Sequence, residues 1–110
     1  FSTVNLRFPE GGLVPAHGVY VTRVRFQDRT SRPAVTNIGV RPTVDDGDRV
    51  NVEGYILDFS GDLYEQTVRV EFYQKLRDER KFSSLEALRE EIMKNAQETW
   101  DYFQGHQPAS

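Results

Sequence analysis

Cysteine is absent from this chain of 110 residues, which excludes disulfides, thiolate catalysis and cysteine-ligated zinc. A reducing compartment such as the cytoplasm is compatible with that absence. No apolar run approaches the length needed to cross a membrane, and no secretory leader is visible. The formal net charge of −3 argues against a broad nucleic-acid-binding surface. We therefore expect a cytoplasmic protein that binds neither membranes nor nucleic acid.

The common phosphate-binding motifs are also missing. The sequence contains neither G-x-x-x-x-G-K-[ST] nor G-x-G-x-x-G, so it has no Walker loop and no Rossmann turn. Asp45, Asp46 and Asp48 resemble part of a calcium loop, but the closing Glu is absent at the required distance, which favours a solvated acidic turn. His17 and His106 lack the spacing of metal ligands. The sequence gives no support to a Ser-His-Asp or Cys-His site.

The chain does contain enough apolar material for one folded domain. Hydrophobic residues make up 37% of it and aromatic residues 12%, which is typical of a globular protein and not of a disordered one. At this length a single core is expected. We assign residues 1–104 to that domain and residues 105–110 to a disordered polar tail.

Four segments have the composition or alternation of β-strands, namely residues 18–27, 33–40, 50–59 and 66–73. In the last of them, Val68, Val70 and Phe72 alternate with polar residues. Residues 41–43 carry a turn signal, and a Gly-containing hairpin at residues 60–62 is expected to join the last two strands. Four strands with short connections indicate an antiparallel meander or a small barrel.

One helix is expected over residues 83–103, after the strands. Ser83 and Glu86 have the spacing of a capping box. Apolar residues recur at three- and four-residue spacing and form a stripe, which consists of Leu85, Leu88, Ile92, Ala96, Trp100 and Phe103. The simpler interpretation is that this stripe covers the sheet, and the alternative is that it docks a partner.

A carboxylate lies within the third predicted strand. Glu53 is flanked by Val52, Ile56 and Leu57, and an acid in a strand interior is unfavourable unless it has partners or a catalytic task. The sequence therefore marks Glu53 as a candidate site residue. The alternative is a surface acid paired across the sheet with Arg49 or Arg69.

Five segments taken together resemble the riboflavin kinase module. They are FSTVNL, HGVYVTRV, AVTNIGVRPT, VNVEGYILDFSGDLYEQTVRVEF and LRDERKFSSLEALREEI. That module occurs alone in eukaryotes and as the C-terminal half of bacterial bifunctional riboflavin kinase/FAD synthetases. The resemblance implies a mostly β fold, a six-stranded antiparallel Greek-key barrel with one C-terminal helix, whose first strand would precede Phe1.

The resemblance also implies an activity and its partners. The family transfers the γ-phosphate of ATP to the 5′-hydroxyl of riboflavin with Mg²⁺, giving FMN and ADP for FMN/FAD biosynthesis. The small-molecule substrates would be riboflavin and ATP. The parent chain would carry an N-terminal FMN adenylyltransferase domain if it is of the bifunctional kind.

Site residues follow from the resemblance position by position. The family's Pro-Thr-Ala-Asn corresponds to Ser2-Thr3-Val4-Asn5, so Thr3 and Asn5 would serve Mg²⁺ and the nucleotide phosphates. Glu53 corresponds to the catalytic glutamate. Tyr64 resembles a position near the nucleotide. Arg77 and Phe82 would lie at the flavin-binding end.

The chemistry of phosphoryl transfer suits these residue types. Hydroxyl and amide oxygens are hard ligands appropriate to Mg²⁺. A carboxylate can accept the proton of the attacking alcohol, a contribution on the order of 10²–10⁴ in rate. In the alternative interpretations, Asn37 supports a turn, residues 77–81 form a solvated charged link, and Phe82 is a hydrophobic staple.

Two other functions remain open at this point. The family often has His where this chain has Tyr55, and this change, with Ser2 and Val4, is compatible with a flavin- or nucleotide-binding module without catalysis. A β-barrel that recognises a protein partner through the 83–103 helix is the third reading, and it predicts an exposed Trp100.

Overall fold

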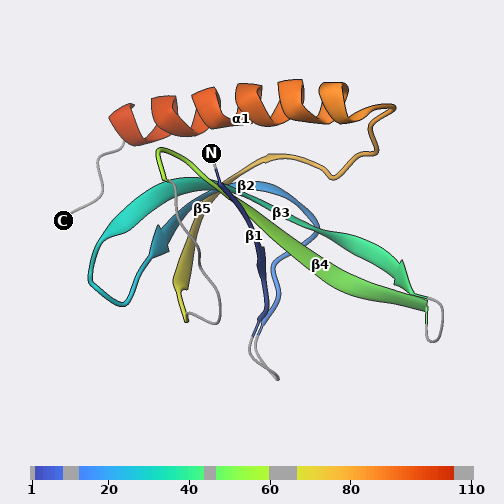
Figure 1. The fold of residues 1–110 in the computed structure, drawn as a ribbon, viewed down its shortest axis with the longest axis horizontal. Helices are drawn as coiled ribbons and strands as arrows, with labels where there is room; N and C mark the ends of the chain where they lie inside the picture. Colours follow the sequence, from blue (N-terminus) through green and yellow to red (C-terminus); the bar gives the residue numbers. More distant parts are fainter. Residues whose placement is uncertain (1, 9–12, 44–46, 60–66, 106–110) are drawn as a thin grey trace.

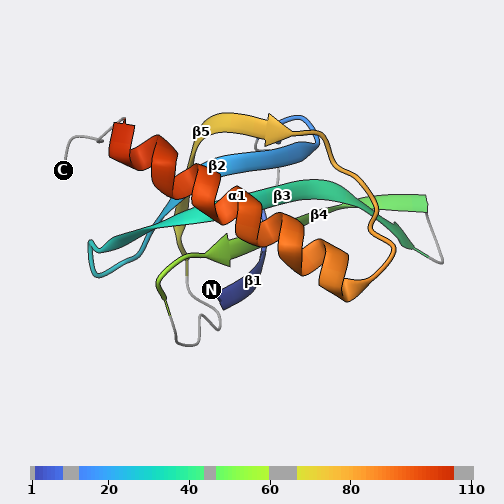
Figure 2. The ribbon, with the colours of Figure 1, turned by 90° about the horizontal axis from the view of Figure 1, so that it is seen from above.

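The computed structural model describes residues 2–8, 13–43, 47–59 and 67–105. It contains an antiparallel five-stranded sheet followed by one C-terminal helix. The elements in chain order are β1 (Ser2–Leu6), β2 (Gly18–Arg25), β3 (Ser31–Thr43), β4 (Gly47–Ile56), β5 (Arg69–Arg77) and α1 (Leu85–Gly105). The strands lie in the order β1-β4-β3-β2-β5, and α1 runs across one face of the sheet (Figures 1 and 2).

The mostly β class with a C-terminal helix is confirmed, whereas the six-stranded barrel is not. Within the described residues the sheet has five strands, and its two edge strands, β1 and β5, are not paired with each other. The sheet is therefore open. The strand β1 was not among the four predicted from periodicity, since five residues give too short a pattern to recognise.

The predicted hairpin between the last two strands is wrong. Strand β4 pairs with β1 on one edge and β3 on the other, while β5 pairs with β2, so β3 and β2 lie between β4 and β5 in the sheet. The predicted turn at residues 41–43 is also wrong, because β3 continues to Thr43, opposite Gly47 of β4. Of the predicted acidic turn, Asp45 and Asp46 lie outside the described residues, whereas Asp48 lies in β4, opposite Pro42.

Both faces of the sheet are buried by apolar side chains. On the face toward α1, Val19, Val35 and Tyr55 pack with Ile92 of the helix. The opposite face has its own cluster of buried residues, which consists of Val24, Ala34 and Ile56, with Val68 and Val70 packed against it. Val68 and Val70 thus lie on one side as the predicted alternation required, although β5 begins only at Arg69, after Val68. Because the middle of the sheet is covered on both sides, every residue of β2 is buried or half-buried, and none is exposed.

The helix differs from its prediction at both ends and on its buried face. Its N-cap is Ser84, not Ser83, since the Ser84 Oγ accepts a hydrogen bond from the Ala87 N–H at 3.1 Å. It ends at Gly105, and residues 106–110 of the predicted tail lie outside the described residues. Two members of the predicted stripe are exposed, Leu85 at 84% and Trp100 at 37%. Ile92 and Phe103 of the stripe are buried as predicted, and the other buried residues of α1 are Asn95 and Thr99.

Strand β5 extends to Arg77, beyond its predicted end at residue 73. Its pairing with β2 shifts register twice, between Val19 and Tyr20 and between Val21 and Thr22. Gly18 permits the close approach at the end of this pairing. Its φ is 153°, and a Cβ there would lie 3.0 Å from the Arg77 carbonyl oxygen, a place only glycine fits easily. These irregularities bring Arg77 to the face covered by α1.

Candidate active site

One row of residues crosses all five strands beneath the start of α1. Asn5 of β1 lies opposite Glu53 of β4, and Glu53 lies opposite Asn37 of β3. The row continues through Val19 of β2 to Arg77 of β5. Directly paired residues of antiparallel strands project to the same face. The sheet register thus gathers polar groups that are far apart in the sequence.

Thr3 belongs to the neighbouring row, opposite Tyr55. It therefore shares a face with Asn5, which lies two residues further along the same strand. Both side chains are exposed at the edge of the sheet. The hydroxyl of Ser2 donates to the carbonyl oxygen of Phe59 at 2.8 Å, so the beginning of β1 is fixed at the position where the family has proline.

Glu53 is half-buried, and each of its carboxylate oxygens accepts a hydrogen bond from the same strand. The amide nitrogen of Asn51 donates to Oε1 at 2.8 Å, and the hydroxyl of Tyr55 donates to Oε2 at 3.3 Å. Residues two apart on a strand project to one face, so this arrangement follows from the sequence NVEGY. These donors hold the carboxylate in one orientation, and an ionised carboxylate has about four acceptor sites, so it can still accept another proton or donor.

The phenol of Tyr55 is strongly perturbed. Burial disfavours its ionised form, and the neighbouring charge of Glu53 acts in the same direction, so the pKa of Tyr55 rises to about 12. Tyr55 is therefore a neutral hydrogen-bond donor over the whole physiological pH range.

At the other end of the row, two arginines lie against an aromatic ring. The guanidinium carbon of Arg77 is 5.4 Å and that of Arg80 is 4.8 Å from the centre of the Phe82 ring, a cation–π arrangement. The Nε of Arg77 also donates to the Asn95 side-chain oxygen of α1 at 3.3 Å. Arg80 and Phe82 come from the link between β5 and α1, which thus folds back over the sheet.

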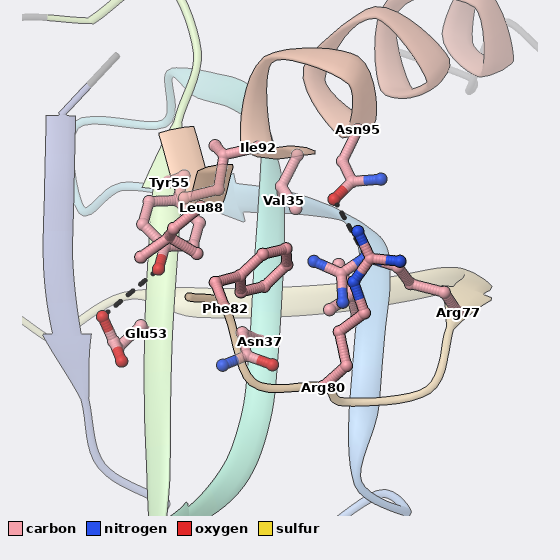
Figure 3. A pocket seen from close by; sticks show the side chains of 11 residues that line it. Val35, Asn37, Glu53, Tyr55, Arg77, Arg80, Phe82, Leu88, Ile92 and Asn95 are labelled. Carbon is pink, nitrogen blue, oxygen red and sulfur yellow. Dashed lines mark hydrogen bonds between the residues drawn. The ribbon is translucent and has the colours of Figure 1, made fainter. Parts of the chain in front are cut away.

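These groups surround one pocket of about 200 Å³ between the sheet and α1. Figure 3 shows Glu53 and Tyr55 on one side of Phe82 and the two arginines on the other. The pocket is lined by Val19, Val35, Asn37, Glu53, Tyr55, Arg77, Arg80, Phe82, Leu88, Ile92 and Asn95. Its walls are apolar and its polar groups converge, which is the usual composition of a small-molecule site.

The structure brings together three of the predicted site residues, Glu53, Arg77 and Phe82, in this pocket. Thr3 and Asn5 lie on the same face of the sheet, next to the strand that carries Glu53. Tyr64 lies outside the described residues. The alternative pairing of Glu53 with Arg69 is wrong, since β4 and β5 are not neighbours in the sheet.

Several pocket residues were missed at the sequence level. Arg80 was assigned to a solvated link, and Asn95 was not recognised at all. Asn95 lies three residues after Ile92 and four before Thr99. This helical spacing could have placed Asn95 on the same buried face of the helix as Ile92. The donors Asn51 and Tyr55 could have been found from their two-residue spacing about Glu53.

The arrangement combines one oriented carboxylate, an aromatic wall and two cations. Such a pocket can hold a flat ring against Phe82 and present an alcohol to Glu53 for deprotonation. Among the described residues, no group of three or more His, Cys, Asp or Glu side chains is placed to hold a metal ion. A cation bound here would need hydroxyl, amide or substrate oxygens.

Comparison with known proteins adds an independent finding. A family model described as Flavokinase, riboflavin kinase, matches residues 1–103. A bifunctional riboflavin kinase/FMN adenylyltransferase of Pseudomonas fluorescens is 51% identical over 79 residues, which cover 72% of this chain and 25% of that relative. The enzyme of the same name from Listeria monocytogenes is 34% identical over 103 residues, which cover 94% of this chain and 32% of the relative.

A solved structure is also similar. It is the crystal structure of a macrolide-efflux protein from Streptococcus pneumoniae, with a TM-score of 0.79 and 34% sequence identity over 88% of this chain and 31% of that one. In the part of our chain that is described, no helix is both long and apolar enough to span a membrane. The chain spans roughly a third or less of the length of these relatives.

Proposed function

Since this chain belongs to the riboflavin kinase family, we propose that it forms the kinase domain of a riboflavin kinase. It transfers the γ-phosphate of ATP to the 5′-hydroxyl of riboflavin and so produces FMN and ADP. The observation that carries this proposal is the row from Asn5 through Glu53 and Asn37 to Arg77, which places these side chains on one face of the sheet. Glu53, Asn37 and Arg77 also line the pocket.

Glu53 acts as the general base. The 5′-oxygen of riboflavin forms a bond to the γ-phosphorus while the bond to the bridging oxygen breaks, and ADP leaves with that electron pair. The hydroxyl proton passes to the Glu53 carboxylate. The hydrogen bonds from Asn51 and Tyr55 support this role, because they fix the carboxylate before the alcohol arrives.

Arg77 and Phe82 bind the flavin. A tricyclic ring needs an apolar surface, which Phe82, Ile92 and Val35 provide in this pocket. The carbonyl oxygens at the ring edge need donors, and the guanidinium of Arg77 has N–H groups for them. Placing the ring between these walls would direct the ribityl chain toward Glu53, on the opposite side of the pocket.

Thr3 and Asn5 serve the nucleotide phosphates and Mg²⁺. Their hydroxyl and amide oxygens are hard donors of the kind that Mg²⁺ accepts alongside waters and phosphates, and their common face with Glu53 fits this role. Mg²⁺ supplies charge neutralisation on the phosphate oxygens. The nucleotide contact of Tyr64 stays a prediction from the resemblance.

The complete fold is proposed to be a six-stranded Greek-key barrel. Leu6 of β1 and Val70 and Phe72 of β5 line the same apolar cavity of about 190 Å³, so the two edges of the open sheet border a common gap. A further strand from residues preceding this chain would close it and remove both edges. Residues 1–104 would then be most of a kinase domain.

The parent protein is proposed to carry an FMN adenylyltransferase domain. Both relatives described above are bifunctional enzymes of that kind, and this chain covers 25% and 32% of their lengths. The proposed location of the whole enzyme is the cytoplasm. This chain has no cysteine, so its fold does not depend on disulfides, which the reducing conditions there would break.

The proposal is tested with Glu53→Gln in the full-length parent protein. We expect ATP-dependent FMN formation to fall by about 10²- to 10⁴-fold, with riboflavin binding retained because the amide has nearly the same shape. Glu71→Gln is the matched control. Glu71 is also a strand carboxylate that accepts a hydrogen bond from a tyrosine two residues later, at 3.1 Å, but it does not line the pocket.

Two results would count against this assignment. Parental turnover in Glu53→Gln would show that Glu53 is not the base. Riboflavin binding by the unaltered parent without FMN formation would instead favour a flavin-binding module that lacks catalysis, the alternative that Tyr55 in place of the family's histidine leaves open.

A further inference from the structure

Glu91 of α1 is a nearly buried carboxylate with several polar partners. Its side chain is only 11% exposed, and its two oxygens lie 3.3 Å from the Arg77 Nε and 2.9 Å from the Arg80 Nη2. Oε2 also accepts a hydrogen bond from the side-chain nitrogen of Asn95 at 3.2 Å. A carboxylate at this depth is tolerated because it is paired on both oxygens.

The partners of Glu91 belong to different elements. Arg77 ends β5, whereas Arg80 lies in the link before α1, which contains neither helix nor strand. Both guanidinium groups lie against the ring of Phe82, at 5.4 and 4.8 Å. One carboxylate on the helix thus joins a strand end to the link and determines where both cations sit beside the aromatic wall.

Glu91 itself is not part of the pocket lining, although Arg77, Arg80, Phe82 and Asn95 are. Its influence on a ligand would therefore be indirect. Long arginine side chains lose rotamer freedom when they are held in one place, and binding is tighter if that loss has occurred before the ligand arrives.

We propose that Glu91 is a positioning residue for the flavin end of the pocket. It holds Arg77 and Arg80 beside Phe82 before substrate binds, so that this wall is preformed. The choice of riboflavin as the ligand rests on the proposed function. Helix α1 then contributes to the site in two ways, through the ion pairs of Glu91 with the two arginines and through the apolar side chains of Leu88 and Ile92.

The test compares Glu91→Gln with Glu90→Gln in the full-length parent protein. Glu90 is the adjacent helix residue and is exposed, which makes it a matched control. We expect Glu91→Gln to raise both the Kd and the KM for riboflavin by about tenfold, since the arginines must then be ordered on binding. Because Glu91 does not touch the reacting atoms, kcat and the KM for ATP are expected to stay within about twofold.

A second comparison shows whether Glu91 acts through the arginines. Adding Glu91→Gln to the double variant Arg77→Gln/Arg80→Gln is expected to leave the riboflavin Kd unchanged, because no cation remains to be positioned. Glu91→Asp keeps the charge and shortens its reach, so an intermediate Kd is expected. This variant carries the test if Glu91→Gln does not fold at the assay temperature.

The outcomes separate the two proposals. A riboflavin Kd and KM for Glu91→Gln equal to those of the active parent overturns the positioning role alone. The positioning role is also overturned if Glu91→Gln lowers thermal stability without changing the riboflavin Kd. It is likewise overturned if Glu91→Gln still raises the riboflavin Kd in the variant that lacks both arginines. An unaltered parent that neither binds riboflavin nor forms FMN overturns the proposed function, and the role of Glu91 with it.

Discussion

At the scale of single residues, Glu53 and Tyr55 illustrate how strand alternation produces a site. They lie two positions apart and therefore project to one face, where the tyrosine hydroxyl donates to the carboxylate. Tyr55 is 7% exposed, so ionising it would place a charge in the apolar cluster beneath α1. Its hydrogen bond and its burial both depend on its remaining a neutral phenol.

Because of this environment, the free energy of unfolding is expected to fall as the pH rises above 10. The pKa of Tyr55 rises from 10 in the unfolded chain to about 12 in the folded protein, so its contribution is fully present below pH 10 and is lost as pH rises through 12. Between these limits Tyr55 is expected to lower the unfolding free energy by about 1 kcal/mol per pH unit. Urea titrations of the parent and of Tyr55→Phe across this range measure the difference, and equal slopes would contradict it.

At this scale the sequence supplied candidate site residues, whose catalytic and binding roles stay predictions. Glu53 was recognisable as an acid inside a strand, and its placement in a pocket with Arg77 and Phe82 agrees with that reading. The roles of Thr3, Asn5 and Tyr64 came only from resemblance, because a hydroxyl, an amide and a phenol in short segments have no distinctive local pattern. Glu91 and Asn95 were missed, because the helix face was assigned from apolar residues alone and both of these residues are polar.

At the scale of elements, the periodic signals placed the strands and the helix but not their ends. The Ser-Ser pair before α1 offered two caps, and the capping-box spacing favoured Ser83, whereas the helix uses Ser84. The predicted stripe is right at Leu88, Ile92, Ala96 and Phe103. It is wrong at Leu85 and Trp100, which fit the spacing as well as the buried Asn95 and Thr99 do. Apolar spacing alone does not reveal which of two adjacent faces meets the sheet.

The cap assignment can be checked with a pair of matched variants. Ser84→Ala removes the acceptor of the Ala87 N–H and is expected to lower the unfolding free energy by about 1 kcal/mol. Ser83→Ala is expected to change it by only a few tenths of that. Chemical denaturation of both variants decides between the two serines, and a larger loss for Ser83→Ala would restore the capping box that the sequence favoured.

At the scale of the whole molecule, the strand order could not be read from the sequence. Short loops favour pairing between consecutive strands, so a hairpin from β4 to β5 was expected. In the structure both edges of β4 are already occupied, by β1 and β3, and β5 pairs with β2 instead. Pairing between distant segments depends on the total burial of both sheet faces, which no local window contains.

The contact of α1 with the sheet contributes both to the core and to the pocket. Ile92 fills the cluster with Val19, Val35 and Tyr55 and also lines the pocket. Ile92→Ala is expected to lower the unfolding free energy by about 2–5 kcal/mol and to weaken riboflavin binding, because the cavity beside the ring is enlarged. Met93→Ala, at a neighbouring position that is 58% exposed, is the control. Urea unfolding and flavin fluorescence measure the two effects, and equal losses in both variants would contradict this assignment.

The row of paired residues from Asn5 to Arg77 has a consequence for the assembly of the site. It takes one residue from each of the five strands, and the pairing of β1 with β4 joins Asn5 to Glu53 across almost half the chain. A slip of β1 by a single residue would turn Asn5 to the opposite face of the sheet and bring Val4 toward Glu53. Ligand binding would therefore report on the register of β1 against β4 as well as on the presence of the site residues.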